Sequence, residues 1–280
     1  MNQLSVEDRC QIIHCLVEGN SIRSTARLTG TVKNTVIKLL CEVGDACSKY
    51  QDEKFRNLTC RRMQCDEIWS FIGCKEKNAT PEMKVKGMGS MWTWTALDSD
   101  TKLVPCWFVG PRDATSAYHF MHNLASRMAT RMQLTTDGLK AYLQAAEDAF
   151  GSEIDYAQLV KIYGREVGPN FKEAQVRYSP PPCIGARKRV VSGDPDPVHI
   201  STSHTERQNL SMRMGMRRFT RLTNAFSKKL QNHERAVALY FMYYNFCRIH
   251  QTLRVTPAME AKIADHVWDI KEIVALVTSQ

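Results

Sequence analysis

The chain has 280 residues, a formal net charge of +9 at pH 7 and an isoelectric point near 9.1. This length can bury a substantial core without disulfide or metal staples, and the excess of cations favours an acidic polymer as partner, because cations displace counterions from phosphates. The ten cysteines form no CxxC pair, and neither a signal peptide nor a membrane-length apolar run is evident. These features exclude the secreted disulfide-rich and membrane-spanning classes, so we expect a soluble, cytoplasmic protein with reduced thiols and no membrane partner.

Helix-period apolar positions such as Ile12 predict a small all-α unit over residues 1–47. Ser21 is placed to cap a short helix, and Thr31 a further helix after a Thr-Gly turn. This is the outline of a helix-turn-helix DNA-binding domain, although a helical hairpin docked on a larger domain has the same pattern. The residues expected to face a DNA major groove are Lys33, Asn34, Thr35 and Lys38.

A polar stretch, 48–62, is expected to be a linker or connecting helix, and from residue 63 short apolar runs alternate with turn residues. We expect strands over 63–73, 91–97 and 103–109, a helix over 114–129, a strand ending at Asp137, a helix over 139–150 and a strand near 156–162. A three-stranded meander followed by alternating helices and strands is the order of a ribonuclease-H-like fold. The sequence therefore predicts an α/β domain over 63–280, with a mixed sheet flanked by helices.

Residues 164–199 interrupt this domain as a proline-rich insertion, which we expect to be an exposed, mobile loop. The following segment, 201–247, is helical in pattern, broken near residues 219–224, and dense in cations. The side chains expected to contact DNA in this helical C-terminal region are Asn209, Arg213, Arg217, Arg218, Lys228 and Lys229. Asn209 has the alternative role of orienting Glu206.

Three acidic residues stand out by their positions: Asp66 early on the first strand, Asp137 at the end of the fourth, and Glu206 in a basic helix. In a ribonuclease-H-like sheet the first and fourth strands are neighbours, so the two aspartates share a cleft that a helix carrying Glu206 can close. Three carboxylates this close repel one another unless a cation neutralises them. The cluster therefore implies divalent metal, and the spacing suits two Mg²⁺ ions acting on a DNA phosphate.

Several segments carry a family resemblance. They are Asp66-Glu67-Ile68-Trp69-Ser70-Phe71-Ile72-Gly73, Thr136-Asp137-Gly138 with Tyr142 following, Thr205-Glu206-Arg207-Gln208-Asn209-Leu210, and Phe226-Ser227-Lys228-Lys229. The chain resembles the DDE transposases of bacterial insertion sequences, closest to the insertion-sequence-one family, over nearly all of its length after Gln64. A later segment, residues 244–258, resembles the closing motif of several integrase-like transposase groups.

The resemblance implies that Asp66, Asp137 and Glu206 are catalytic metal ligands for two Mg²⁺ ions, with Mn²⁺ as a substitute. It also implies binding to the terminal inverted repeats of an element and to target DNA, 3′-end strand transfer, and a homo-oligomeric synaptic complex. Two other classes remain open: a structure-selective nuclease of the same fold, which cuts without joining, and a catalytically inactive, transposase-derived DNA-binding regulator.

Overall fold

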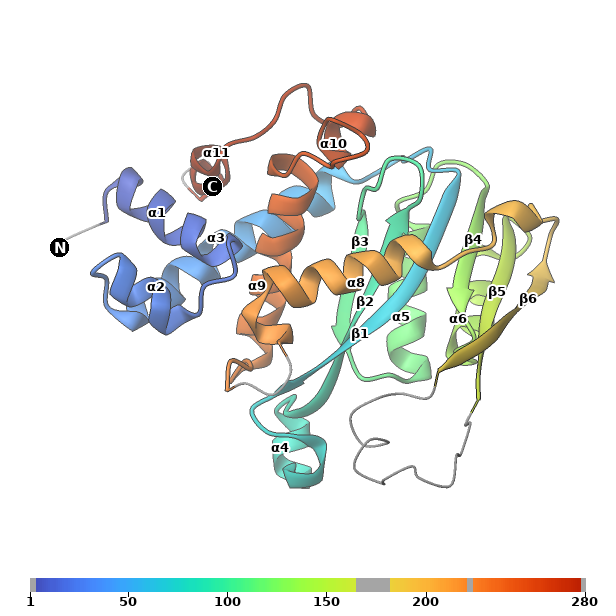
Figure 1. Cartoon of the computed structure of the whole chain (residues 1–280), viewed down its shortest axis with the longest axis horizontal. Coiled ribbons are helices and arrows are strands. Elements are labelled where there is room, and N and C mark those ends of the chain that lie inside the picture. The colour runs from blue at the N-terminus through green and yellow to red at the C-terminus, as the bar shows by residue number, and fades with distance from the viewer. Residues whose placement is uncertain (1–3, 165–181, 221–223, 278–280) are drawn as a thin grey trace.

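The computed structural model describes residues 4–164, 182–220 and 224–277, and its centre is a six-stranded mixed sheet (Figure 1). The strands are β1 (Arg62–Ile72), β2 (Gly89–Asp98), β3 (Cys106–Gly110), β4 (Met132–Asp137), β5 (Ile154–Tyr163) and β6 (Cys183–Ser192). Their order is β3-β2-β1-β4-β5-β6; β1 to β3 form an antiparallel meander, and β4 and β5 run parallel to β1. This is the predicted mixed sheet, and it is consistent with a ribonuclease-H-like fold.

Helices cover both faces of this sheet (Figure 1). α8 (Ser203–Gly215) packs on β1 and β2, while α5 (Ala114–Ala125) and α6 (Ala141–Phe150) pack against each other on the other face. The rings of Trp94, Phe120 and Tyr142 are fully buried and contact one another beneath α5 and α6. Because the sheet is covered on both sides, β2 also buries Thr93 and Thr95.

The N-terminal helices are α1 (Val6–Val17), α2 (Ile22–Leu28) and α3 (Lys33–Lys54). Ser21 caps α2 as predicted, because its hydroxyl accepts a hydrogen bond from the backbone N–H of Ser24. The expected cap of α3 differs by one residue: Val32 occupies it, and the Thr31 hydroxyl donates instead to a carbonyl in the preceding turn. The inward positions predicted for α3 are buried, namely Val36, Leu39 and Leu40.

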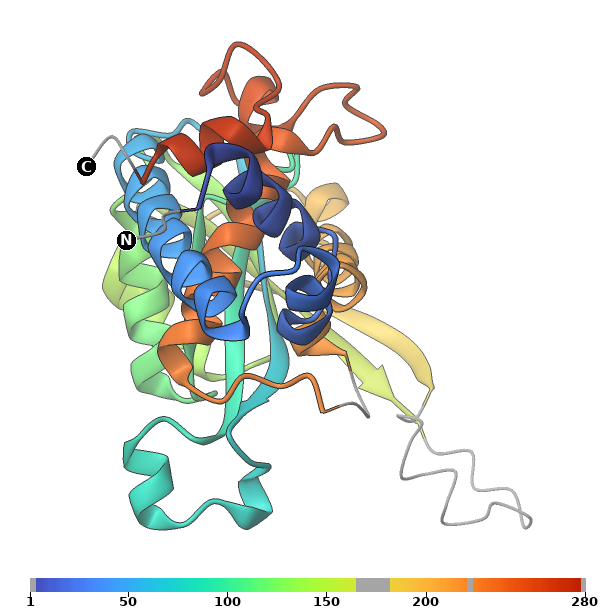
Figure 2. The ribbon, with the colours of Figure 1, turned by 90° about the vertical axis from the view of Figure 1, so that its left-hand side faces the viewer.

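α3 packs along α9 (Leu230–Met242), which lies near the other end of the chain (Figure 2). The helix runs without a break across residue 47, where the sequence predicts the end of a domain, and it occupies the first half of the expected linker. The reason is visible at Gln51, whose buried side-chain amide donates to the carbonyl oxygen of Ala238 in α9. A position that looks polar in the sequence is thus an internal contact between two helices.

The chain after α9 returns to the N-terminal helices. It continues through the π-helical turn η4 (Tyr243–Cys247) and α10 (Pro257–Glu260) to α11 (Ile270–Ala275), which packs against α1. Shorter elements complete the described structure: η1 (Glu76–Asn78), α4 (Pro81–Val85), η2 (Pro197–His199) and η3 (Arg217–Phe219). Within the described residues, no helix combines the length and apolar character needed to cross a bilayer.

The insertion expected as an irregular loop is in part a strand. Residues 165–181 lie outside the described residues, but β6 pairs antiparallel with β5 along Tyr156 to Tyr163. The prediction fails here because β6 is an edge strand whose side chains are mostly exposed, so it carries no burial pattern for the sequence to reveal. Backbone hydrogen bonds hold it, and the triplet Arg187-Lys188-Arg189 lies within it.

Candidate active site

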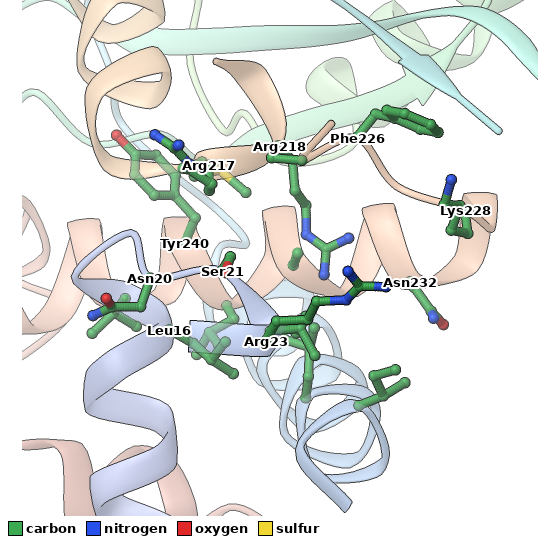
Figure 3. A pocket seen from close by; sticks show the side chains of 18 of the residues that line it. Leu16, Asn20, Ser21, Arg23, Arg217, Arg218, Phe226, Lys228, Asn232 and Tyr240 are labelled. Carbon is green, nitrogen blue, oxygen red and sulfur yellow. The ribbon is translucent and has the colours of Figure 1, made fainter. Parts of the chain in front are cut away.

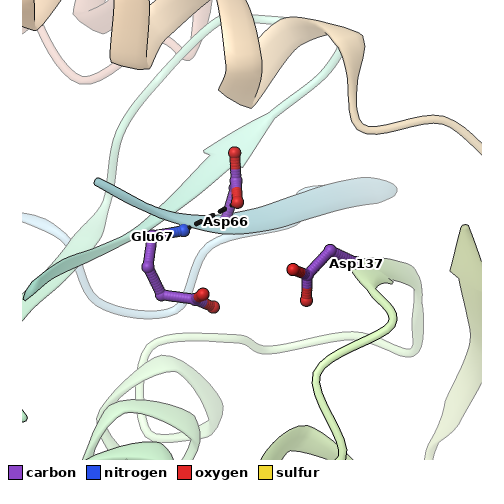
Figure 4. Close-up of side chains that lie close together, drawn as sticks. All are labelled: Asp66, Glu67 and Asp137. Carbon is purple, nitrogen blue, oxygen red and sulfur yellow. Dashed lines mark hydrogen bonds between the residues drawn. The ribbon is translucent and has the colours of Figure 1, made fainter. Parts of the chain in front are cut away.

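The register of the two central parallel strands brings the predicted aspartates together. β1 and β4 are paired up to Cys65 opposite Thr136, and the next residue on each strand is an aspartate, Asp66 or Asp137. β4 ends at Asp137, while β1 continues for six more residues, so the acids lie where the sheet opens beside β1 (Figure 4). The sequence placed both residues correctly because strand order and strand ends are sufficient to locate them.

Glu67 joins this pair. Asp66, Glu67 and Asp137 each offer a carboxylate oxygen, and these oxygens all lie within 4.8 Å of one another. Neighbouring residues on a strand point to opposite faces, and Figure 4 shows Asp66 and Glu67 doing so, with the Asp137 carboxylate beside the gap between them. A carboxylate from either face of β1 can therefore reach the space beyond the end of β4.

An arginine bridges two of the three carboxylates. Arg112, in the turn before α5, donates from Nε to Glu67 Oε2 at 3.0 Å and from Nη2 to Asp137 Oδ2 at 3.1 Å. Its guanidinium also lies over the ring of Trp92, 4.9 Å from the ring centroid. The forked geometry of Arg suits two acceptors in one plane, and stacking on Trp92 fixes that plane.

Burial of these acids changes their proton affinity. Burial raises the pKa of Glu67 to about 7, and the charge of Asp137 adds to this, although Arg112 opposes it. Burial likewise raises the pKa of Asp66 to about 6, with contributions from the negative charges of Asp137 and Glu206. The cluster therefore concentrates more negative charge than its one arginine neutralises, and a further cation at this place is favoured.

α8 is docked directly on the acidic strand. The side-chain oxygen of Gln64, on β1, accepts hydrogen bonds from the backbone N–H groups of His204 and Thr205 in the first turn of α8. One turn later, the Asn209 amide donates to Asp66 Oδ2 at 2.9 Å. Polar side chains of β1 and α8 thus hold the helix across the strand at the position of the cluster.

Glu206 lies on this helix but outside the group of three carboxylates. Its carboxylate forms an ion pair with Lys161 of β5 at 2.6 Å and accepts a hydrogen bond from the Thr202 hydroxyl. It remains close enough to Asp66 for its charge to contribute to the raised pKa of that group. The structure therefore brings Asp66 and Asp137 together as predicted, adds Glu67, and places Glu206 at the edge of the same site.

The donor atoms of the site suit a hard divalent cation. Glu67 Oε1 and Asn209 Oδ1 are buried and have no hydrogen-bond partner among the described residues. With the carboxylates of Asp66 and Asp137 they make an all-oxygen set, which is the ligand type that Mg²⁺ and Mn²⁺ prefer. Asp66, Glu67 and Asp137 are the residues that would hold the metal, with Glu206 adjacent.

The predicted DNA contacts fall into two groups. In the first turns of α3, Lys33, Asn34 and Lys38 are exposed and Thr35 is half-buried. Beyond Glu206, the exposed ones are Arg217, Lys228 and Lys229, and Arg213 is half-buried. Two differ from the expectation of free contacts: Asn209 is buried against Asp66, and Arg218 is half-buried and donates to the Ser227 hydroxyl.

Besides the place of Glu67 in the cluster, three contributors to the site were not predicted from the sequence: Arg112, Lys161 and Gln64. Arg112 lies in a Gly-Pro-Arg-Asp turn, where an arginine is ordinarily solvated, and Lys161 lies on a strand close to the edge of the sheet. The usable signal was at Gln64, a polar residue inside an apolar strand two positions before Asp66. Such a side chain is buried only when it has a partner.

No protein-family model matches this chain, and no curated protein matches it. Among solved structures it is similar to a piggyBac transposase, determined by cryo-electron microscopy as a synaptic complex with hairpin DNA. The identity is 12% and the TM-score is 0.40, and the alignment covers 99% of this chain and 73% of the other.

Proposed function

We propose that this protein is a DNA transposase that binds the terminal inverted repeats of an insertion sequence, cleaves DNA strands and joins the 3′-ends to target DNA. The observation that carries the proposal is the convergence of Asp66, Glu67 and Asp137 where β4 ends beside its parallel neighbour β1. Buried acids with raised pKa values, in a basic chain, are typical of a site that binds cations and acts on phosphates.

The residues have distinct roles in this proposal. Asp66, Glu67 and Asp137 would hold divalent metal, and Asn209 orients the Asp66 carboxylate through the hydrogen bond it donates. Glu206 would complete the shell from α8, and its carboxylate is held by an ion pair with Lys161. When bound, two Mg²⁺ ions, or Mn²⁺ in their place, would lower the pKa of a nucleophilic water or 3′-hydroxyl and neutralise charge on the scissile phosphate.

Arg112 limits the charge at this site. Its guanidinium neutralises Glu67 and Asp137, whereas Asp66 lies on the opposite face of the strand from Glu67.

Because two element ends must be cut and joined together, we also propose that the active form is a homo-oligomer on DNA. The DNA contacts proposed outside the metal site are the exposed cations near the start of α3 and those after α8.

The test is an assay on duplex DNA carrying the inverted repeats that flank the gene, with Mg²⁺. Asp66→Asn, Asp137→Asn and Glu206→Gln are each expected to lower both cleavage and joining by more than the roughly 10- to 100-fold typical of residues that only support a metal ligand. Binding to the same DNA in EDTA should stay near the wild-type level, because none of the three side chains is proposed to hold DNA without metal.

Glu153→Gln is the matched control. Glu153 is exposed and precedes β5 at the opposite end of the sheet, so removing its charge should leave both steps unchanged. Joined product with all three site variants contradicts the assignment. Cleavage without joining in the wild type indicates a structure-selective nuclease, and metal-independent binding without cleavage indicates a regulator.

A further inference from the structure

A pocket of about 740 Å³ lies between the N-terminal helices and the segment that joins α8 to α9 (Figure 3). α1, α2 and α3 form one side, and residues from Gly215 to Tyr240 form the other. The pocket is apart from the acidic cluster: none of the residues that line it belongs to that cluster. It joins segments about two hundred positions apart in the chain, so the whole fold is needed to build it.

The charge of the pocket has one sign. Its lining includes five cationic side chains and no acidic one among the described residues: Arg23, Lys33, Arg217, Arg218 and Lys228. Figure 3 shows the guanidinium groups of Arg23 and Arg218 pointing toward one another from opposite sides. Like charges that face each other across a confined space repel, and an anion between them removes that repulsion.

Arg218 is the best defined of these cations. Burial lowers its pKa to about 10, still high enough to keep the guanidinium charged at neutral pH. One of its N–H groups donates to Ser227 Oγ at 2.7 Å. Because the hydroxyl of Ser227 is neutral, it does not cancel the positive charge of Arg218. The guanidinium therefore keeps most of its attraction for an anion.

A buried hydrogen-bond chain fixes this arginine. Because Ser227 Oγ accepts from Arg218, its own hydrogen is free for His233 Nδ1, 2.9 Å away. His233 Nε2 then carries the ring proton and faces Ser70 Oγ at 3.4 Å, and Ser70 donates to the carbonyl of Met91. Burial, and then the charge of Arg218, lower the pKa of His233 to about 3, so the ring stays neutral and this direction of donation is maintained.

This chain of hydrogen bonds ends on β1, the strand that carries the acidic cluster. Ser70 is four residues beyond Asp66 on β1, so these hydrogen bonds link Arg218 to the strand that carries the acidic site. Lys228 is also constrained, since its ammonium lies 3.9 Å from the centroid of the Phe226 ring. Arg218 and Lys228 are therefore positioned by the fold before any ligand arrives, which favours specific recognition of an anion.

We propose that this pocket binds a backbone phosphate of DNA, gripped between Arg23 of α2 and Arg218 of the segment after α8. The assignment to DNA rests on the function proposed above, whereas the preference for a phosphate rests on the pocket itself. Paired guanidinium groups match the oxygen atoms of a phosphate with parallel hydrogen bonds. Binding there would hold the N-terminal helices, and the sheet that shares their core, on one DNA molecule.

The experiment is a titration of fluorescein-labelled duplex, carrying the flanking inverted repeat, with full-length protein in EDTA at several salt concentrations. Arg23→Gln is expected to lower the affinity about tenfold and to reduce the slope of log affinity against log salt by about 1, as for one lost phosphate contact. Arg27→Gln is the matched control, because Arg27 is exposed on the same helix and lies outside the pocket. The substitution removes the same charge as Arg23→Gln. It should change the affinity less than twofold.

Arg218 provides the second arm. Arg218→Lys keeps the charge and loses the fork, so we expect a smaller loss than for Arg218→Gln, with thermal unfolding confirming that each variant folds. If both arginines hold one phosphate, the double variant Arg23→Gln with Arg218→Gln loses less than the product of the two single losses. Equal weakening by Arg23→Gln and Arg27→Gln overturns the proposal, because only general charge would then matter.

Two further results separate the two proposals. If wild-type protein cleaves and joins DNA but Arg23→Gln binds it normally, the pocket assignment fails alone. If the wild type neither cuts nor prefers the repeat, yet Arg23→Gln still weakens binding to any duplex, the transposase assignment fails and the pocket stands.

Inorganic phosphate tests for a free anion as the ligand. If it raises the melting temperature of wild type but not of Arg218→Gln, and DNA affinity is insensitive to both arginines, the pocket binds a free anion and the DNA ligand is overturned.

Discussion

Glu67 shows how one residue can change the balance of a site. Its side chain has no exposed surface, and one of its oxygens has no hydrogen-bond partner among the described residues. Arg112 satisfies the other oxygen. Such an acid is stable when it is protonated or when a second cation lies beside it. Ionised with Arg112 as its one cationic partner in the part of the chain that the structure describes, it destabilises the folded state.

This gives a pH-dependent prediction for the metal-free protein. The pKa of Glu67 is 4.5 in an unfolded chain and about 7 in the folded protein, so between these values the folded state binds more protons than the unfolded state. The free energy of unfolding therefore falls as pH rises through this window, by up to about 3 kcal/mol from this residue. Glu67→Gln should remove that part of the fall.

The measurement is urea unfolding in EDTA at pH 4.5, 6 and 8. The stability of Glu67→Gln relative to wild type should increase from the lowest pH to the highest, and Mg²⁺ should reduce the difference at pH 8 by stabilising the wild type. Glu153→Gln, at an exposed position, is expected to follow the wild-type curve. A constant difference across all three pH values is incompatible with the raised pKa.

The sequence located Asp66 and Asp137 but not the arginine between their elements. The early position of Asp66 on β1 and the end of β4 at Asp137 are local features, and the order of strands places the two side by side. Arg112 reaches the site from a turn whose direction depends on how α5 packs beneath the sheet. Glu67 was missed as a cluster member for another reason: alternation along β1 assigns it to the face opposite Asp66, and only the early end of β4 lets both faces share one space.

At the scale of elements, the contact between α3 and α9 is the closest helix packing that the glycines reveal. A Cβ atom on Gly44 would lie 2.6 Å from both the Cβ and the carbonyl oxygen of Arg235 in α9. These are atoms of the partner backbone and its first side-chain carbon, so no rotamer change relieves the contact. The glycine in the middle of α3 is thus explained by close approach and not by a break in the helix.

Gly44→Ala is therefore expected to destabilise the protein. Alanine gains up to about 1 kcal/mol from helix propensity, whereas overpacking of a tight contact costs about 1–3 kcal/mol, so the net change is unfavourable. Gly185→Ala is the control, because a Cβ there meets no atom within 4 Å. Urea unfolding of the two variants at one pH compares them, and a Gly44→Ala protein as stable as wild type contradicts a close contact between Gly44 and Arg235.

β6 marks the limit of prediction at this scale. The buried strands were predicted from short apolar runs, and α8 from the helical pattern of residues 201–247. An exposed edge strand has neither signal, since its stability comes from backbone hydrogen bonds to β5 and from nothing in its own composition. The same argument explains why the sequence ended a domain at residue 47: polar Gln51 is buried only through its partner in α9.

At the scale of the whole molecule, the described part of the chain shares one continuous core. It extends from Ile12 in α1, through the sheet, to Val274 in α11. The chain leaves the N-terminal helices to form the sheet and then returns to cover them with α9 and α11. In a separate amino-terminal domain joined by a linker, the longest helix would not pack against the carboxyl-terminal region as α3 packs against α9.

We therefore predict that α3 and the sheet open together. Hydrogen exchange followed by mass spectrometry should give the slowest amides of α3 and of β1 the same free energy of opening, because neither element can leave the core without exposing the other. An N-terminal domain that unfolds alone would show α3 amides exchanging orders of magnitude faster than those of β1.

Gly44→Ala makes the test independent of absolute rates. The substitution lies in α3, and the atoms nearest to its Cβ belong to Arg235 of α9, so in a molecule with two separable units it would lower protection in α3 and leave β1 unchanged. In a molecule with one cooperative core, the same substitution lowers the opening free energy of β1 amides by the amount it lowers the global stability. Equal losses of opening free energy in α3 and β1 would mean that the stability of the proposed DNA-contacting helices and that of the acidic site are coupled in the absence of any ligand.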